Sequence, residues 1–521
     1  MNFLLAFDAG TGSIRAVLFN ELGEQVCVAQ QEWTHSSDPD YPGSMNFDYA
    51  NNWNVIIQCI REILAKTNIH PTSIKAISAT SMREGFVLYD ENGHEIWACA
   101  NVDARAGQEV EELKRQDENL ELINYKLSGQ TFALGAVPRL LWLKNHQPHI
   151  YEKITAITMI NDWILYKLSG VLQADPSNGC TTGLFDLTTR NWSNEITELY
   201  DIKNKIFTPV NEAGTLIGQV SAEAALLTGL SEETLIVAGG GDAQIASVGV
   251  GAIENGQAIV SGGSFWQQEM NIDKPIIDTS SRVRINCHAI QNLWQVETIA
   301  FSPGLVTRWF RDSFCDKEVE EAKSLGKDFY EVMEEKAKEV PPGSYGVIPI
   351  FSNIMNFISW RHAAPSFINL SLDPNKSGKH VLFRALQENA AMVTLGNLKV
   401  IEEVTGQYPA EIIFAGGASN GKLWAQILAD VLGVRVKIPV IKEAAALGTA
   451  LYAGVGAGIF DNIADVVQKV VQFERIYEPN MEHHQTYQKF YKTWCSVYAE
   501  QLKLADKKMT EHMWIAPGLT T

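Results

Sequence analysis

Three short turns, each preceded by an apolar run, have the composition of phosphate-binding loops. Glycine lets a backbone approach a ligand closely, and consecutive N–H groups in such a turn converge on phosphate oxygens. A tight hairpin is the alternative interpretation of the first turn. The Walker motif GxxxxGK[ST] is absent, which argues against a P-loop fold. The turns are DAGTGS at 8–13, GGGD at 239–242 and GGASN at 416–420.

Two of these turns carry an aspartate at the end of the preceding strand, Asp8 in the first and Asp242 in the second. Transfer of a phosphoryl group to an alcohol needs a carboxylate that accepts the hydroxyl proton and a magnesium ion that offsets the phosphate charge. Carboxylates at these two positions suit both tasks. The alternatives are a turn-forming residue for Asp8 and a helix N-cap for Asp242.

A basic and an acidic residue, Arg83 and Glu84, follow the apolar segment 74–82. Recognition of a polyhydroxylated compound needs a hydrogen-bond donor and an acceptor that converge on neighbouring hydroxyls. The pair therefore predicts an acceptor-binding site, with a surface ion pair as the alternative. His94 and His362 show no metal-ligand spacing.

The elements that must position these residues form an α/β pattern. The first two apolar runs predict a hairpin, and a third strand at 25–33, a helix at 47–67 and a strand at 74–82 follow. A second hairpin of the same kind is predicted at 256–270, half a chain later. This repetition indicates an internal duplication with a boundary near residues 251–255.

Length and composition narrow the class of protein. A chain of 521 residues is long enough for two domains, and a net charge of −19 disfavours nucleic acid or an anionic membrane as the main partner. The seven cysteines are scattered without a CxxC pair, as is typical of reduced thiols. The uncharged stretch 444–460 is too rich in alanine and glycine for a membrane span, and the first strand leaves no room for a signal peptide. We expect a cytoplasmic protein.

Taken in order, the motifs resemble those of the FGGY carbohydrate kinase family, and the similarity extends from residue 3 to about residue 460. The resemblance implies an α/β fold of two ribonuclease-H/actin-like (hexokinase-type) domains, with mixed sheets flanked by helices and an ATP cleft between them. Residues 1–250 would bind the acceptor and hold the catalytic base, and residues 251–521 would bind the nucleotide. The segments that carry the resemblance are DAGTGSIR, ADPSNGCTTGLFDLTTRNW, GGGDAQ, SGGSFW and AGGASNGKLWAQILAD.

The resemblance also assigns roles to residues. Arg15 would lie within reach of the phosphates. Two positions depart from the family pattern: Ser264 replaces a threonine and keeps the hydroxyl, whereas Arg139 replaces a lysine and changes the donor geometry, so Arg139 receives no role. The implied roles are a catalytic base at Asp242, Mg²⁺ at Asp8 and Asp242, ATP at Thr11, Gly12, Ser13, Ser264, Gly304, Gly416, Gly417 and Asn420, and the acceptor at Arg83, Glu84 and Asp103.

Other segments narrow the match within the family. They resemble kinases that phosphorylate the terminal hydroxyl of linear, hydrated 4,5-dihydroxy-2,3-pentanedione, a quorum-sensing signal that phosphorylation would trap in the cell. A pentulose or glycerol kinase and a non-catalytic sugar or nucleotide sensor are the alternatives. The family also implies a phosphotransferase-system carrier as a candidate regulator, and a homodimer is a candidate assembly. The narrowing segments are SMREGFVLYDENG, IWACANVDARA, PRLLWL, GGSFWQQ and HAAPSFINLSLDP.

Overall fold

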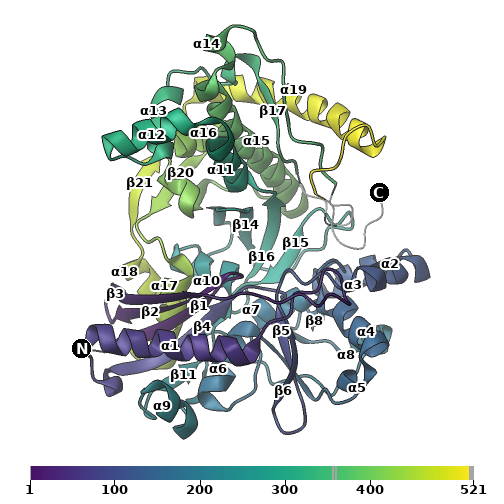
Figure 1. Ribbon diagram of the computed structural model, residues 1–521, viewed down its shortest axis with the longest axis vertical. Coiled ribbons are helices and arrows are strands. Elements are labelled where there is room, and N and C mark those ends of the chain that lie inside the picture. Colours follow the sequence, from purple (N-terminus) through teal and green to yellow (C-terminus); the bar gives the residue numbers. More distant parts are fainter. Residues whose placement is uncertain (1, 355–356, 358–360, 515–521) are drawn as a thin grey trace.

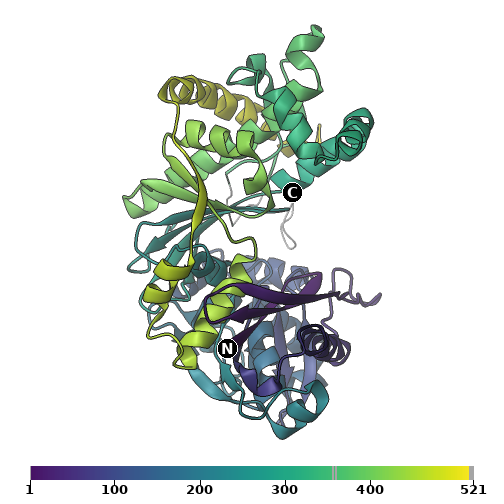
Figure 2. The same cartoon turned by 90° about the vertical axis from the view of Figure 1, so that its left-hand side faces the viewer.

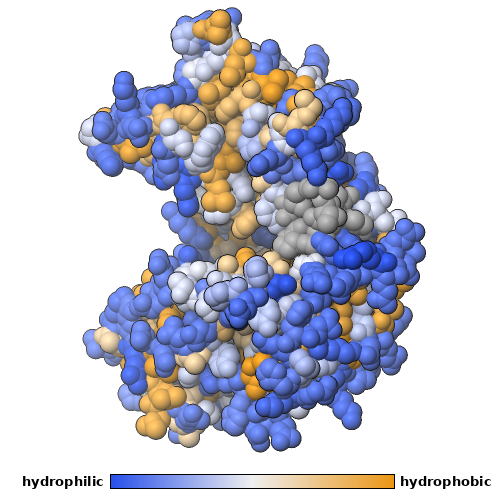
Figure 3. All heavy atoms as spheres, turned by 45° about the vertical axis from the view of Figure 1, so that its right-hand side comes forward, coloured by the Kyte–Doolittle hydropathy of each residue, from blue (hydrophilic) through white to orange (hydrophobic). Residues whose placement is uncertain are grey.

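The computed structural model describes residues 2–354, 357 and 361–514. It consists of two α/β lobes that lie one above the other along the long axis, with the N-terminus in the lower lobe (Figure 1). A 90° turn shows the same two lobes, joined at the side that faces away from the opening (Figure 2). The surface is hollowed between the lobes (Figure 3).

The sheet of the lower lobe has the order β10-β11-β4-β1-β2-β3, with β12 beside β4. β1 is antiparallel to β2 and parallel to β4, so the chain returns to its first strand through helix α1 (Tyr49–Thr67). The side chain of Asp48 caps α1 by accepting a hydrogen bond from the N–H of Asn51. The strands are β1 (Phe3–Ala9), β2 (Ser13–Asn20), β3 (Gln25–Glu32), β4 (Ile74–Ser81), β10 (Leu216–Gln219), β11 (Leu235–Val237) and β12 (Gly240–Gly241).

The sheet of the upper lobe has the order β15-β16-β14-β13-β19-β20-β21. Its strands are β13 (Ala258–Gly262), β14 (Trp266–Ile272), β15 (Arg284–Cys287), β16 (Trp294–Ala300), β19 (Glu411–Ala415), β20 (Arg435–Pro439) and β21 (Phe473–Tyr477).

The two sheets repeat one arrangement, which bears out the predicted duplication. In each, three consecutive antiparallel strands (β1-β2-β3 and β13-β14-β16) are extended by two parallel strands (β4-β11 and β19-β20) on the other side of the first strand. In Figure 1, β1 and β2 lie at the top of the lower lobe and β14 at the bottom of the upper lobe, on the sides of the two lobes that face each other.

Further helices and small sheets complete both lobes. Within the described residues no helix is both long and apolar enough to cross a membrane. The small sheets contain β5 (Phe86–Tyr89), β6 (Glu95–Cys99) and β7 (Ala156–Met159); β8 (Phe185–Asp186) and β9 (Asn191–Trp192); and β17 (Ile348–Ile350) and β18 (Ser366–Ile368). The helices are α2 (Gly107–Gln116), α3 (Leu120–Ser128), α4 (Ala136–His146), α5 (Pro148–Tyr151), α6 (Ile160–Ser169), α7 (Pro176–Gly179), α8 (Asn194–Leu199), α9 (Ala222–Thr228), α10 (Asp242–Gly249), α11 (Pro303–Phe314), α12 (Asp316–Leu325), α13 (Phe329–Ala337), α14 (Pro374–Ser377), α15 (Lys379–Thr405), α16 (Lys422–Leu432), α17 (Ala444–Gly456), α18 (Ile463–Val470) and α19 (Met481–Asp506).

The first strand is apolar on both faces because helices cover both faces of its sheet. Phe3, Leu5 and Phe7 share one core with α1 and α6. Leu4 and Ala6 point to the other face, into a core formed with α10 and α17. Alternation along one strand thus fills two separate cores.

Helices α17 and α18 belong to the predicted C-terminal domain, residues 251–521, but they lie against the sheet of the lower lobe. α17 crosses α10 at very short range. A Cβ on Gly448 would lie 2.2 Å from the carbonyl oxygen of Ile245, and a Cβ on Gly249 would lie 1.9 Å from that of Ala444. Glycine at both positions is therefore what allows the two backbones to approach so closely.

The lobes also touch along β15, at the edge of the upper sheet. The hydroxyl of Tyr125 donates to the carbonyl of Val283 at 2.6 Å, and the amide of Gln130 donates to the carbonyl of Ile285 at 3.1 Å. This contact places β15 and β16 beside the loops that follow β4 in the lower lobe.

Candidate active site

Asp242 is the first residue of α10, directly after the three glycines. A Cβ on Gly239 would lie 1.8 Å from the carbonyl oxygen of Ala79, so the glycine run lets the chain pass tightly beside β4. The N-cap position is occupied by Gly241, and the carboxylate of Asp242 accepts only the neighbouring N–H of Ala243 at 2.8 Å. The N-cap alternative is therefore wrong. Burial raises the pKa of Asp242, and the nearby guanidinium of Arg83 lowers it.

Asp8 lies one residue before the end of β1, opposite Arg15 on β2. The pKa of Asp8 is raised to about 7, first by burial and then by the negative charge of Asp242, while Arg15 opposes both effects. The structure therefore brings the two predicted carboxylates close enough to repel each other. Two crowded carboxylates need a cation to remain ionised together.

The first phosphate turn is open to the cleft. Thr11 and Gly12 are exposed, the N–H of Gly10 donates to the carbonyl of Ser13 at 2.9 Å, and the hydroxyl of Thr11 donates to Asn101 at 3.2 Å. Arg15 forms an ion pair with Glu443, the residue before α17, and its Nη1 lies 4.0 Å from Asp8. No sequence motif predicts a role for Glu443.

The predicted nucleotide residues of the upper lobe meet around one hairpin turn. A Cβ on Gly304 would lie 2.1 Å from the carbonyl oxygen of Gly263, and a Cβ on Gly416 would lie 2.6 Å from that of Gly262. Gly416 also has a φ of 82°, which favours glycine. Ser264, Gly417 and Asn420 are exposed beside these contacts, so all five predicted residues lie together.

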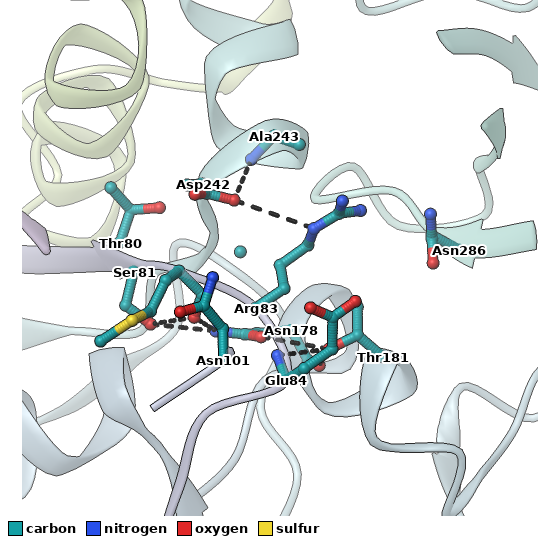
Figure 4. Close-up of polar contacts among 12 residues, drawn as sticks. Thr80, Ser81, Arg83, Glu84, Asn101, Asn178, Thr181, Asp242, Ala243 and Asn286 are labelled. Atoms are coloured by element: carbon teal, nitrogen blue, oxygen red, sulfur yellow. Dashed lines mark hydrogen bonds and ion pairs between the residues drawn. The ribbon is translucent and has the colours of Figure 1, made fainter. Parts of the chain in front are cut away.

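The predicted acceptor pair follows β4 and faces the catalytic turn. The Nε of Arg83 lies 3.9 Å from Oδ1 of Asp242. Figure 4 shows the Arg83 side chain rising between Asp242 and Asn286. The backbone of Glu84 adopts a φ of 64°, and its N–H donates to the hydroxyl of Thr181 at 3.2 Å. The left-handed backbone conformation at Glu84 thus lets the side chains of Arg83 and Glu84 lie in the same part of the site.

Both members of the acceptor pair form ion pairs with the upper lobe, and the sequence analysis missed these partners. Glu297 on β16 accepts two hydrogen bonds from Arg83, one of them at 3.2 Å, and Arg284 on β15 donates to Glu84 at 2.8 Å. Glu269 on β14 lies opposite Glu297 in the antiparallel register. These partners could have been suspected from the sequence, because charged residues are rare inside strands that are otherwise apolar and buried.

Asp103 lies behind the acceptor pair rather than beside it. Its side chain is fully buried and accepts hydrogen bonds from the N–H of Met45 at 2.7 Å and from Arg105 at 2.6 Å. Arg139, which received no role, donates to the backbone carbonyls of the segments that carry the site. The acceptors are Glu84, Asn101 and Asp103. A guanidinium has the donors for three carbonyls at once, which an ammonium cannot place in one plane.

Comparison with protein-family models gives two consecutive matches. The N-terminal domain of the FGGY family of carbohydrate kinases matches residues 3–249, and the C-terminal domain of the same family matches residues 273–457. The chain belongs to the FGGY family of carbohydrate kinases. It is therefore a phosphotransferase, with two α/β domains of the actin-like ATPase fold as predicted.

Relatives and solved structures agree with this family. An autoinducer-2 kinase from Yersinia enterocolitica is 51% identical over 519 residues, which cover 99% of this chain and 98% of the relative. An autoinducer-2 kinase from Escherichia coli is 52% identical over 518 residues, with the same coverage. A ligand-bound xylulose kinase and a gluconate kinase, both from Lactobacillus acidophilus, each have a TM-score of 0.85 at 19% identity, cover 98% and 97% of this chain, and are covered to 100% and 99%. At that identity the two structures support the fold of this FGGY kinase and nothing more.

Proposed function

We propose that this FGGY kinase transfers the γ-phosphoryl group of ATP to the terminal hydroxyl of autoinducer-2, linear 4,5-dihydroxy-2,3-pentanedione. The observation that carries the reaction is the carboxylate of Asp242, which lies 3.9 Å from Arg83 and directly after the glycine turn at 239–241. The observation that supports this substrate is the similarity, at about 51% identity over nearly the whole chain, to kinases named for autoinducer-2.

In the proposed reaction, Asp242 accepts the proton of the acceptor's terminal hydroxyl. The alcohol oxygen then forms a bond to the γ-phosphorus while the bond between that phosphorus and the bridging oxygen of ADP breaks. Arg83 contributes a positive charge that favours the ionised, basic form of Asp242 against the effect of burial. The turns at Thr11–Ser13 and at Ser264 offer hydroxyl and N–H groups to the phosphates.

Asp8 and Asp242 fit a magnesium ion by their chemistry. Both supply oxygen ligands, and the charge of Asp242 raises the pKa of Asp8, so a nearby cation would favour ionisation of Asp8. Mg²⁺ is usually held by one or two carboxylates together with phosphate oxygens and water. In the described part of the chain no three His, Cys, Asp or Glu side chains form a metal-binding group. When bound, the ion supplies charge stabilisation to the phosphates.

A substrate panel tests this function. With ATP and Mg²⁺, we expect the highest kcat/KM for 4,5-dihydroxy-2,3-pentanedione and lower values for xylulose, ribulose and glycerol. Faster phosphorylation of xylulose or glycerol at equal low concentration would overturn the substrate and leave the kinase activity intact. If no acceptor is phosphorylated, the chain is the non-catalytic sensor instead.

Three further expectations from the sequence are not tested by the site. A cytoplasmic location, a phosphotransferase-system carrier as regulator and a homodimer stay predictions. The same is true of the division into domains at residue 250.

A further inference from the structure

The two residues predicted to bind the acceptor are each paired with an opposite charge from the other lobe. Nη2 of Arg83 donates to Oε1 of Glu297 at 3.2 Å, and Nη1 of Arg83 donates to Oε2 of the same carboxylate. Nη1 of Arg284 donates to Oε1 of Glu84 at 2.8 Å. Neighbours in the sequence of one lobe therefore contact two charged residues of the other.

Those two partners are themselves neighbours. Arg284 on β15 and Glu297 on β16 lie directly opposite each other in the antiparallel register. Arg83, Glu297, Arg284 and Glu84 thus form a group in which the sign of the charge alternates; we call it the charge quartet. Its four side chains are between 0% and 14% exposed. A sheet ladder fixes the spacing of one half of the quartet, and the loop after β4 fixes the other half.

Two further acidic residues lie beside the quartet. Glu269 lies opposite Glu297 on the far side of β16, and its Oε1 is buried without a hydrogen-bond partner in the described structure. Burial and the charge of Glu297 raise the pKa of Glu269 to about 8. Asp242 lies beside Arg83. Asn286 donates to Glu297 at 3.1 Å. Both guanidinium groups of the site are therefore engaged by carboxylates of the protein, and further carboxylates stand next to them.

We propose that Arg284 and Glu297 are specificity-determining residues that restrict this kinase to uncharged polyhydroxylated carbonyl compounds and exclude sugar acids. A buried carboxylate on the acceptor would need a cation, because an unpaired charge out of water is strongly unfavourable. The quartet leaves each arginine neutralised by a glutamate, so an acidic acceptor gains no ion pair and meets the carboxylates of Glu84, Glu297 and Asp242. Hydroxyl and carbonyl groups need only hydrogen bonds, which ionised partners provide without a change in net charge.

The inference rests on the proposed kinase function and on the place of Arg83 and Glu84 in its acceptor site. It does not depend on which neutral compound is the substrate. A carboxylate-free acceptor of any identity meets the same quartet, so the substrate panel and the specificity test fail independently.

The test measures kcat/KM for the best neutral acceptor and for D-gluconate or a four- to six-carbon aldonate, in the wild type and in Glu297→Gln. In the wild type we expect the aldonate to be at least about a hundredfold poorer. Glu297→Gln removes one carboxylate and leaves Arg83 with unneutralised charge. The neutral acceptor should lose about tenfold or more in kcat/KM, and the ratio of aldonate to neutral acceptor should rise about tenfold or more.

The matched control is Glu403→Gln. Glu403 forms an exposed ion pair with Arg282, two residues before β15, at 2.6 Å. The control removes the same charge from a neighbouring arginine outside the quartet, and both acceptors should be used as in the wild type.

A second variant protects the test against misfolding. Glu84→Gln leaves Arg284 without its carboxylate partner, whereas Glu297→Gln does this to Arg83, so Glu84→Gln should also raise the ratio of aldonate to neutral-acceptor kcat/KM. The thermal unfolding and the ATP affinity of both variants report whether they are folded. The inference is overturned if the wild type uses aldonates as well as neutral acceptors. It is equally overturned if the ratio stays constant in folded Glu297→Gln and Glu84→Gln while both acceptors lose activity, because the glutamates then act only on structure.

Discussion

The two hairpins that open the two lobes have the same topology and different chemistry. In the lower lobe the residue before the end of the first strand is Asp8, opposite Arg15. In the upper lobe the corresponding position of β13 is Ser261, opposite Gln267. The lower hairpin is joined by Asp242 at the start of α10, whereas the upper one is surrounded by glycines that touch it through backbone atoms.

The difference shows how a duplicated scaffold can divide one reaction. The lower lobe keeps the carboxylates: burial raises the pKa of both, and the charge of Asp242 adds to the rise at Asp8. The upper hairpin has an uncharged turn whose shape depends on close contacts at Gly304 and Gly416. Substitutions around the lower hairpin should therefore affect turnover and its pH dependence, and substitutions around the upper hairpin should affect nucleotide affinity.

The largest expected effect concerns the lower lobe. Asp242→Asn removes the proton acceptor and should lower kcat about 10²–10⁴-fold, with ATP affinity nearly unchanged. Asp316→Asn is the matched control, because Asp316 is also the first residue of a helix and is exposed. Turnover and ATP binding are measured separately, and near-normal turnover of Asp242→Asn would remove this residue from the chemistry.

An intermediate effect is expected in the upper lobe. Gly304→Ala would place a Cβ 2.1 Å from the carbonyl oxygen of Gly263, so the turn that holds Ser264 must shift. Overpacking of this kind costs about 1–3 kcal/mol, and the KM for ATP should rise about tenfold or more while acceptor KM changes little. In the control Gly218→Ala the new Cβ has only ordinary contacts, at 3.6 Å. An equal rise in the KM for the acceptor would contradict the division between the lobes.

A smaller effect is expected from Arg139→Lys. The ammonium cannot donate to the carbonyls of Glu84, Asn101 and Asp103 with the guanidinium's fork geometry, so the loop that presents the acceptor pair loses part of its support. The kcat/KM for the acceptor should fall about three- to tenfold at constant ATP affinity. Steady-state kinetics with each substrate varied in turn measure this. An effect confined to the KM for ATP would contradict the role of Arg139 in supporting the acceptor pair.

The smallest expected effect is a pH dependence of Mg²⁺ affinity, which only the lower hairpin should cause. Because the pKa of Asp8 is raised to about 7, the carboxyl is mainly protonated below that pH and ionises as pH rises through it. Binding of Mg²⁺ needs the ionised form, so the apparent affinity for Mg²⁺ should increase a few-fold between pH 6 and pH 8, with release of a proton.

The same carboxyl should leave a mark on stability in the absence of metal. A folded pKa above the unfolded value means that the folded protein holds the extra proton, so this contribution to stability is lost as pH rises from about 4 to about 7. Asp8→Asn should therefore unfold at a higher temperature than the wild type at pH 8 and at a similar one at pH 4. Ser261→Ala, at the corresponding position of the upper hairpin, should show no such dependence on pH.

The parts of the site that the sequence could predict are contiguous. Residues 8–13 and 416–420 carry their glycines, hydroxyls and carboxylate within single turns, and the strand-turn pattern places them without any knowledge of distant contacts. The duplicated sheets were predictable for the same reason, since each hairpin repeats the same local order of apolar and turn residues.

The parts that the sequence could not predict depend on residues far apart in the chain. Arg83 and Glu297 are separated by 214 positions, and Arg15 and Glu443 by 428. Neither glutamate belongs to a motif. The burial of Asp103 could not be predicted either, because the sequence of Asp103 and its partner Arg105 is as compatible with an exposed loop as with a buried one. The position of α17 on the lower sheet required the crossing with α10, which only the folded chain shows.

That crossing determines what can rotate. The chain crosses between the lobes after Gly249, again just before α17, and a third time between α18 and β21; the first two crossings pass beside the point where Gly249 and Gly448 bring the helices together. α10 has eight residues and is about 12 Å long. A swing of the upper lobe about this pivot would carry Ser264 and Gly416 along a wide arc, while Asp242 and Asp8, which both belong to the stationary side, would keep their separation. Such a swing would change the distance from the two carboxylates to the glycine turns of the upper lobe and leave the turn at Thr11–Ser13 beside the carboxylates.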